Sequence, residues 1–230
     1  MREDRSASAN ARIGRIQAAD ARLDQGSRAA LAQLAEMIEA WPGLVSGPAG
    51  PLADDCLVLL DHLGSARRLV DVGSGGGLPG LVLKIARPEL QVTLIEADQA
   101  KAAFLVQASA RLGLLGVDVV ATRAEDAGRD TRYRERFDLA VARALAPLPV
   151  LAELCLPLVR VGGRLLAQKT EKEEIAHAER AITILGGRLD AAQPGASTAR
   201  RLGVVVTIAK VAPTPEAYPR RPGVPARKPL

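Results

Sequence analysis

The sequence predicts an α/β protein built on a mostly parallel sheet with helices on both faces. Three observations predict it. Short apolar runs alternate with helix-length segments along most of the chain. The first run, residues 68–72, breaks directly into a glycine-dense turn at 73–77. The runs Leu69-Val70 and 117–120 have the dense apolar character of strands that are covered on both faces.

Residues 1–64 are predicted to form a helical extension in front of an α/β domain over residues 65–230. The first helix is expected over about 16–40, where apolar residues recur at helical spacing. Trp41-Pro42-Gly43 ends this helix, and a shorter helix over about 52–63 leads into the first strand.

Strands and helices alternate within the α/β domain. The strands are expected at 68–72, 91–95, 117–121, 138–142, 164–168 and 202–211, and the helices at 79–86, 101–112, 147–158 and 171–185. This alternation favours parallel pairing through right-handed crossovers. Gly186-Gly187 and Gln193-Pro194-Gly195 instead indicate an antiparallel, hairpin-like region late in the chain.

Composition limits the classes of function. At 230 residues the chain suits one globular domain with an appendage, and its net charge of +5 permits a polyanionic partner without requiring one. Aromatic residues make up 2%, fewer than in domains that stack RNA bases on rings. Cys56 and Cys155 are too few for a disulfide or zinc framework, so no metal site is expected. No apolar leader or membrane-length run is present, which predicts a cytoplasmic protein without a membrane partner.

The turn after the first strand carries the strongest functional signal. Glycine permits positive φ and lets a ligand approach the backbone, and the following helix start offers unpaired N–H groups. Such an element holds a nucleotide-like cofactor. Gly73, Gly75 and Gly77 occupy the first, third and fifth positions of the motif, and Leu78 occupies the sixth. A dinucleotide fingerprint has glycine at the sixth position, and a phosphate-binding P-loop would close with Gly-Lys-Ser/Thr.

The form Asp-x-Gly-x-Gly-x-Gly, beginning at Asp71, is similar to motif I of methyltransferases that use S-adenosylmethionine (SAM). Gly73, Gly75 and Leu78 are therefore candidate cofactor-binding residues. Two alternatives stay open at this point: a nicotinamide dinucleotide, and a turn that only packs helix against strand.

Polar residues follow the next strands at the edge where open α/β sheets bind ligands. The candidates are Glu96, Ala97 and Asp98 after the second strand, Ala124 and Glu125 after the third, and Arg143 after the fourth. A carboxylate such as Glu96 can accept hydrogen bonds from both ribose hydroxyls, whereas Asp98 is expected to cap the next helix. Ala124 and Glu125 suit the adenine edge. Each residue alone could be a cap or a surface charge, but their coincidence at one edge favours a cofactor site.

The glycine turn, two strand ends and the C-terminal tail together resemble one family. The matching segments are 71–80, 123–125, 141–144 and 218–225. They are similar to the bacterial ribosomal small-subunit methyltransferase G family, also called glucose-inhibited division protein B, over roughly residues 67–230. The resemblance implies a Rossmann-like class I SAM-dependent methyltransferase that modifies N7 of one guanine in 16S rRNA of the small ribosomal subunit.

The same resemblance assigns SAM to Gly73, Leu78, the 96–98 segment, Ala124, Glu125 and Arg143. We expect a monomer whose partner is 16S rRNA or the small subunit. The chain departs from the family pattern in three places, at 44–46, at 55–57 and at Lys169-Thr170. These departures concern substrate recognition more than cofactor binding.

Guanine N7 carries a lone pair and no proton, so its methylation needs no general base. Arg143 and Lys169 are the candidate catalytic residues, because a cation near the purine can orient the base through O6. Arg143→Ala is expected to lower activity more than tenfold while leaving the fold intact. Phosphate contacts are hypothesised for some of Arg12, Arg15, Arg22, Arg28, Arg200, Arg201, Arg220, Arg221, Arg227 and Lys228.

Three other functions remain open. They are a SAM-dependent methyltransferase acting on another RNA or a small molecule, a ribosome-assembly factor without turnover, and a nicotinamide-dependent oxidoreductase, which Leu78 at the sixth motif position disfavours.

Overall fold

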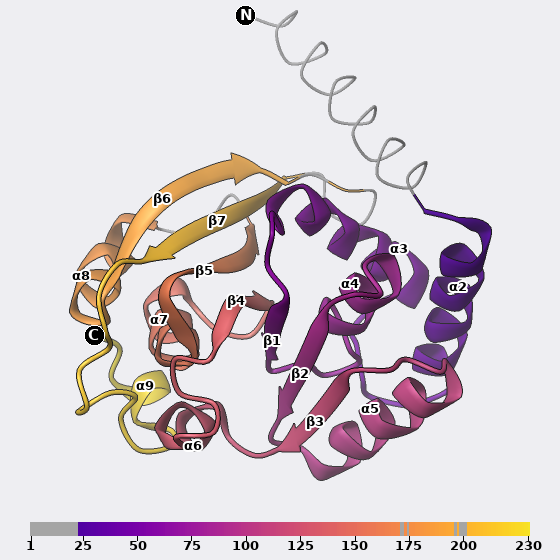
Figure 1. Cartoon of the computed structure of the whole chain (residues 1–230), viewed down its shortest axis with the longest axis horizontal. Helices are drawn as coiled ribbons and strands as arrows, with labels where there is room; N and C mark the ends of the chain where they lie inside the picture. Colours follow the sequence, from indigo (N-terminus) through magenta and orange to yellow (C-terminus); the bar gives the residue numbers. More distant parts are fainter. Residues whose placement is uncertain (1–22, 171–172, 174, 196, 198–201) are drawn as a thin grey trace, which may run out of the picture.

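The computed structural model of this chain describes residues 23–170, 173, 175–195, 197 and 202–230. These residues form a seven-stranded sheet in the order β3-β2-β1-β4-β5-β7-β6 (Figure 1). The strands are β1 (Arg68–Val72), β2 (Gln91–Glu96), β3 (Val117–Ala121), β4 (Phe137–Arg143), β5 (Val159–Thr170), β6 (Gly187–Pro194) and β7 (Gly203–Lys210). β7 runs antiparallel to β5 and β6, and the other neighbouring strands pair in parallel. The predicted α/β fold with a mostly parallel sheet is confirmed.

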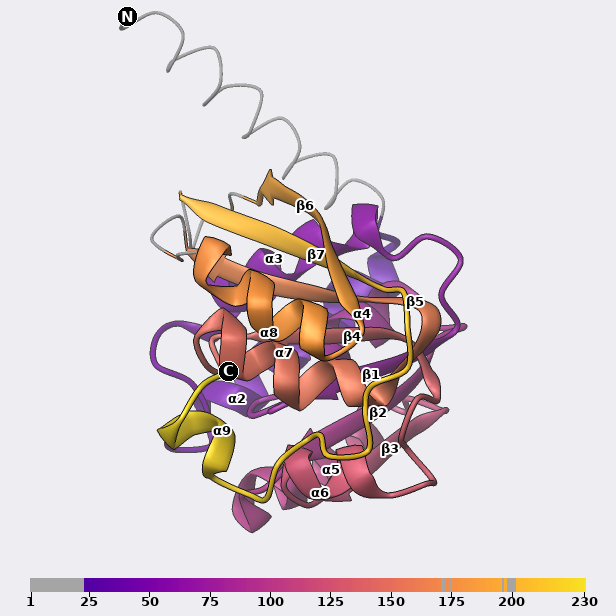
Figure 2. The same cartoon turned by 90° about the vertical axis from the view of Figure 1, so that its left-hand side faces the viewer.

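Helices cover both faces of the sheet, as Figures 1 and 2 show. One face carries α2 (Gln25–Glu39), α3 (Ala49–Cys56), η1 (Leu57–His62), α4 (Gly80–Ala86) and α5 (Gln99–Arg111). The other carries α6 (Ala124–Arg129), α7 (Leu148–Cys155), η2 (Leu156–Leu158), η3 (Ile175–Ala178), α8 (Glu179–Ile184) and α9 (Val224–Arg227). Successive strand residues alternate between the two faces, so Leu69 joins one hydrophobic cluster and Val70 the other.

The helices α2, α3 and η1 form the described part of the predicted N-terminal extension, and residues 16–22 of the predicted first helix lie outside the described residues. Asp24 caps α2 by accepting a hydrogen bond from Ser27 N at 2.6 Å. Leu34 and Ile38 of α2 are buried in one cluster with Leu81 of α4. The extension therefore shares a hydrophobic core with the sheet, and a domain boundary at residue 64 stays a prediction.

β5 begins earlier than the predicted 164–168. Val159 pairs with Phe137 and Arg164 pairs with Leu139, so residues 160–163 bulge out of the ladder. Gly163 allows this bulge, because a Cβ there would lie 2.6 Å from the Asp138 carbonyl oxygen. Glycine within the bulge hides the start of the strand from an analysis of hydrophobic periodicity.

Other boundaries also differ from the prediction. The helix expected over 147–158 ends at Cys155 and continues as the 3₁₀ turn η2, where Pro157 has no N–H to donate. The hairpin-like region supplies β6 as a full partner of β7. The helix expected over 171–185 is η3 and α8 in its described part, since residues 171, 172 and 174 lie outside the described residues.

The C-terminal tail, residues 213–230, is held against the helices by buried polar contacts (Figure 2). Arg134 donates to the carbonyl oxygens of Gly128, Thr214 and Tyr218 at 2.7 to 2.9 Å. The Arg220 guanidinium forms two short bonds to Glu153, at 2.6 and 2.8 Å, and the Glu153 side chain is fully buried. The structure thus gives Arg220 a role in packing the tail.

Arg220→Ala is expected to lower the free energy of unfolding by about 3–5 kcal/mol, because it leaves the buried Glu153 carboxylate without its charged partner. The matched control is Arg221→Ala. Arg221 is exposed, so its removal should change stability by less than about 0.5 kcal/mol. Urea denaturation of both variants measures the difference, and equal stabilities would show that the ion pair does not stabilise the tail.

Candidate functional site

The glycine turn between β1 and α4 adopts the positive-φ backbone conformation that its glycines permit. Gly73, Gly75 and Gly77 have φ values of 72°, 53° and 82°, in the left-handed region that favours glycine. The N–H groups of Gly73 and Ser74 donate to the Ile95 carbonyl oxygen at 2.9 and 3.1 Å. The turn is therefore anchored to the end of β2, the neighbouring strand.

Two glycines mark close approaches at the turn. A Cβ on Gly80 would lie 2.5 Å from Leu94 Cδ2 and 2.7 Å from Asp71 Oδ2. A Cβ on Gly73 would lie 2.5 Å from Cδ1 of Leu145, in the loop after β4. Gly80 thus lets α4 pack onto the strands, and Gly73 brings the loop after β4 against the turn.

Asp71 lies beneath the turn and is 1% exposed. Its Oδ2 accepts a hydrogen bond from Gly80 N at 2.8 Å. Its Oδ1 is buried and has no hydrogen-bond partner among the described residues. Burial raises the pKa of Asp71 to about 7. A carboxylate with a vacant, desolvated oxygen is a favourable partner for a cationic ligand group.

Glu96 and Asp98 at the end of β2 are both positioned by backbone amides. Glu96 accepts from Gly75 N at 2.8 Å and from Asp98 N at 2.9 Å, one bond to each carboxylate oxygen. Asp98 Oδ1 accepts from the N–H groups of Ala100 and Lys101, so its predicted role as the cap of α5 is confirmed. The structure brings Glu96 to the glycine turn, with Ala97 exposed beside it.

Ala124 and Glu125 form the first turn of α6 after β3. Glu125 is 7% exposed, and its Oε1 accepts a hydrogen bond from Gly223 N of the C-terminal tail at 2.8 Å. The sequence analysis did not connect these two segments. The tail thus fixes the carboxylate that was expected at the adenine edge.

Arg143, the last residue of β4, is paired with a residue of the N-terminal helices. Its Nε lies 3.3 Å from Asp55 Oδ2, and Asp55 of α3 is 2% exposed. Asp55 also accepts a hydrogen bond from the Ser197 hydroxyl. Gln168 Nε2, at the end of β5, donates to the Asp55 carbonyl oxygen at 2.8 Å. Asp55 therefore joins α3 to the ends of two strands.

Sequence reasoning missed Asp55 and Gln168. The sequence did offer one signal for Asp55, a carboxylate placed directly before the apolar residues 56–60. In the structure Cys56, Leu57 and Leu59 of this run are buried. Gln168 carried no such signal.

Lys169 supports the loop after β4 from the other face of the sheet. Its Nζ lies 3.0 Å from Glu173 Oε2 and donates to the Ala146 carbonyl oxygen. Glu173 Oε1 accepts from Leu148 N at 2.6 Å, at the start of α7. Lys169 and Glu173 together hold residues 146–148 in place.

A cavity of about 410 Å³ opens at the ends of β4 and β5. It is lined by Leu52, Asp55, Arg143, Ala144, Leu145, Ala146, Pro147, Gln168, Lys169, Thr170 and Glu173. The predicted catalytic residues Arg143 and Lys169 thus lie at one cavity. Leu145 lines this cavity and also lies against Gly73, so the cavity adjoins the glycine turn.

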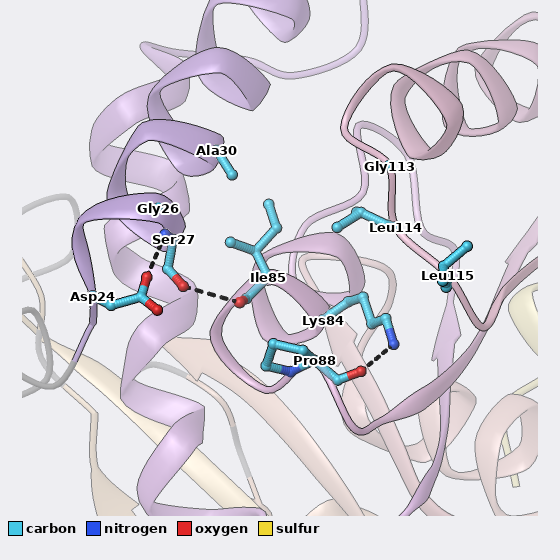
Figure 3. Close-up of a pocket in the computed structure, with 10 residues that line it drawn as sticks. All are labelled: Asp24, Gly26, Ser27, Ala30, Lys84, Ile85, Pro88, Gly113, Leu114 and Leu115. Carbon is cyan, nitrogen blue, oxygen red and sulfur yellow. Dashed lines mark hydrogen bonds between the residues drawn. The ribbon is translucent and has the colours of Figure 1, made fainter.

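A second cavity, of about 430 Å³, lies at the opposite end of α4, between α2 and the segment before β3 (Figure 3). Its polar side chains bond to the protein itself. Lys84 Nζ donates to the carbonyl oxygens of Pro88 and Leu90, and Ser27 Oγ donates to that of Ile85. Asp24, which also lines the cavity, accepts from Ser27 N, so each of these polar side chains has a partner within the protein.

The described residues contain no group of three or more His, Cys, Asp or Glu side chains that could hold a metal ion. Among the helices that the structure describes, none is long and apolar enough to cross a membrane.

Comparison with known proteins gives consistent matches. The model of the family described as rRNA small subunit methyltransferase G matches residues 52–202. The Ribosomal RNA small subunit methyltransferase G of Moorella thermoacetica is 44% identical over 211 residues, which cover 90% of this chain and 85% of that protein. The protein of the same name from Roseiflexus castenholzii is 50% identical over 165 residues, covering 71% of this chain and 70% of that protein.

Solved structures share the fold at low identity. The O-methyltransferase TomG of Streptomyces achromogenes, solved in complex with SAM, matches with a TM-score of 0.55 and 20% identity, covering 82% of this chain and 91% of that one. A putative O-methyltransferase from Klebsiella pneumoniae also gives a TM-score of 0.55, at 16% identity, covering 83% of this chain and 91% of that one. These matches show the class I methyltransferase fold that was predicted.

Proposed function

This chain belongs to the rRNA small subunit methyltransferase G family, and we propose that it transfers a methyl group from SAM to N7 of a guanine in 16S rRNA of the small ribosomal subunit. One observation carries the proposal. The family match spans residues 52–202, and this range contains the glycine turn, Glu96, Arg143 and Lys169. The matched family therefore includes both the turn and the cavity that adjoins it.

The turn fits SAM on its own geometry. Gly73, Gly75 and Gly77 carry no side chains and have positive φ, so this part of the turn presents backbone. The unpartnered Asp71 Oδ1 suits the α-ammonium group in the amino-acid half of SAM. Glu96 accepts one amide bond at each oxygen and keeps a second lone pair on each for ribose hydroxyls. The bound cofactor supplies a methyl group activated by its sulfonium.

Ala97, Asp98, Ala124 and Glu125 complete the proposed cofactor site. Asp98 holds the start of α5 beside Glu96. The bond from Gly223 holds Glu125 at the start of α6, where the adenine edge is expected. Gly75 and Leu78 belong to the turn itself, and Gly75 positions Glu96.

The residues at the cavity suit a reaction that moves no proton. Guanine N7 attacks with its own lone pair, so the rate depends on holding it in line with the methyl group. The Arg143 guanidinium and the Lys169 ammonium are the candidate donors to O6. A donor on N7 itself would block the reaction, so O6 is the proposed contact.

The family assignment also supports the proposed partner and location. We propose that this protein meets 16S rRNA or the assembled small subunit, and that it does so in the cytoplasm. We further propose that it acts as a monomer without a bound metal.

Methyl transfer with radiolabelled SAM tests the proposal. The substrates are 16S rRNA and small subunits from a strain that lacks the modification, and total metabolite extract serves as the comparison. Borohydride reduction followed by aniline cleavage is expected to cut the labelled rRNA at a single guanine. Label incorporated only into the extract, or into rRNA without a cleavage site, would contradict the proposal.

A further inference from the structure

The cavity at the ends of β4 and β5 is placed to receive the base that is methylated. Leu145 forms part of its wall and also lies against Gly73 of the cofactor turn. A volume of about 410 Å³ is within the range of small-molecule sites. Enzymes that modify bases bind them in such pockets after turning them out of the stack.

Gln168 gives this cavity a fixed acceptor. The residue is 1% exposed and forms part of the cavity wall. Its Nε2 donates to the Asp55 carbonyl oxygen at 2.8 Å, which sets the orientation of the amide. Oε1 is therefore the remaining polar atom, and within the described part of the chain it has no hydrogen-bond partner. A buried acceptor that no protein donor satisfies is available to a donor from a ligand.

Arg143 places a donor next to this acceptor. Arg143 and Gln168 are partners in the register of β4 and β5, so their side chains leave the sheet on the same face from strands about 4.8 Å apart. Guanine presents an acceptor, O6, directly beside a donor, N1–H. Adenine presents the reverse pattern, with an amino donor beside the N1 acceptor. A fixed donor beside a fixed acceptor thus matches guanine.

We propose that this cavity binds the target guanine and that Gln168 determines its specificity, accepting a hydrogen bond from N1–H while Arg143 donates to O6. The inference rests on the proposed function, since it names the residue that selects the base for that same reaction. Gln168 acts here by contact with the base.

The first test uses the unaltered enzyme and target-base analogues in reconstituted 16S rRNA. Inosine keeps O6 and N1–H, whereas 2-aminopurine lacks both, and each retains N7. We expect kcat/KM to fall at least tenfold with 2-aminopurine and less than threefold with inosine. Equal rates for guanine and 2-aminopurine would overturn the inference, as would an equal loss with both analogues.

The second test asks whether Gln168 is the source of this discrimination. Gln168→Leu is expected to lower kcat/KM for rRNA at least tenfold, to leave the Kd for SAM within twofold, and to shrink the difference between guanine and 2-aminopurine. Gln91→Leu is the matched control, because Gln91 is exposed at the far end of the sheet, at the start of β2. It should change none of these values.

The outcomes separate the two proposals. If the unaltered enzyme does not label guanine N7 at all, the proposed function fails. If it labels N7 and Gln168→Leu keeps the same preference for guanine over 2-aminopurine, only the role of Gln168 fails. Should Gln168→Leu not fold, Gln168→Met, which keeps the length of the side chain and removes the acceptor, takes its place in the same measurements.

Discussion

Replacing Arg143 with alanine is expected to lower the rate of rRNA methylation by more than tenfold. Arg143 ends β4, lines the cavity beside the glycine turn, and keeps its side chain 15% exposed. Its removal takes away the proposed donor to guanine O6, and with it the orientation of N7 toward the methyl group. Steady-state methylation of small subunits measures the effect, and unchanged turnover would remove Arg143 from the mechanism.

The structure adds a stability cost that the sequence analysis did not include. Asp55 is 2% exposed, and Arg143→Ala deprives its carboxylate of the guanidinium 3.3 Å away. Breaking one side of a buried ion pair costs about 3–5 kcal/mol.

A double variant separates stability from activity. Asp55→Asn added to Arg143→Ala should recover part of the lost stability in urea denaturation, because it removes the buried charge that the guanidinium had faced, but it should not recover activity. Recovery of both would mean that Arg143 acts only through folding.

Binding of SAM is expected to weaken as the pH falls below about 7. Burial raises the pKa of Asp71 to about 7, and only the ionised carboxylate attracts the cationic half of the cofactor. Below this pH the carboxyl group must first lose a proton, so affinity falls by up to about tenfold per pH unit. Titration calorimetry between about pH 5.5 and pH 7.5 measures this slope.

Asp71→Asn tests the assignment of the slope. This variant should bind SAM more weakly at pH 7.5 and lose the pH dependence, because the amide neither titrates nor carries charge. A slope retained in Asp71→Asn would place the titrating group elsewhere.

Asp71 also makes the stability of the fold depend on pH. As the pH rises, its contribution to stability falls, whereas the affinity for SAM is expected to increase. The folded state holds the Asp71 proton with a pKa of about 7, against 3.8 as the ordinary value. Between these two values the folded chain binds more protons than the unfolded chain, so the contribution of Asp71 to stability falls as pH rises from about 4 to about 7. Asp71→Asn should flatten this part of the stability profile.

The features that the sequence predicted correctly depend on residues close together in the chain. The bounds of β1 and β3 match the structure, because their apolar runs end at glycine or polar residues that stop a strand. Asp98 was expected to cap a helix, and the N–H groups that donate to its carboxylate belong to residues only two and three positions further along the chain. The short α6 and α9 escaped prediction, because neither is long enough to show apolar periodicity.

One rule combined these local signals into a predicted site: in open α/β sheets, ligands bind at the carboxyl ends of the strands. It pointed to the edge of the sheet at which the structure places Glu96 and Arg143, on the ends of β2 and β4. The roles of these residues toward SAM and guanine stay predictions.

By itself, the sequence determined the mostly parallel α/β fold and the glycine turn, since both follow from short-range spacing. The family was indicated by a resemblance of several segments along the chain, and the matches to known proteins show it. Only the tertiary structure decided which side chains meet across long separations. Asp55 and Arg143 are 88 residues apart, Glu125 and Gly223 are 98 apart, and Asp55 and Gln168 are 113 apart. The physical reason is that a buried polar group bonds to whichever partner the packed elements bring to it, and no local pattern encodes that partner.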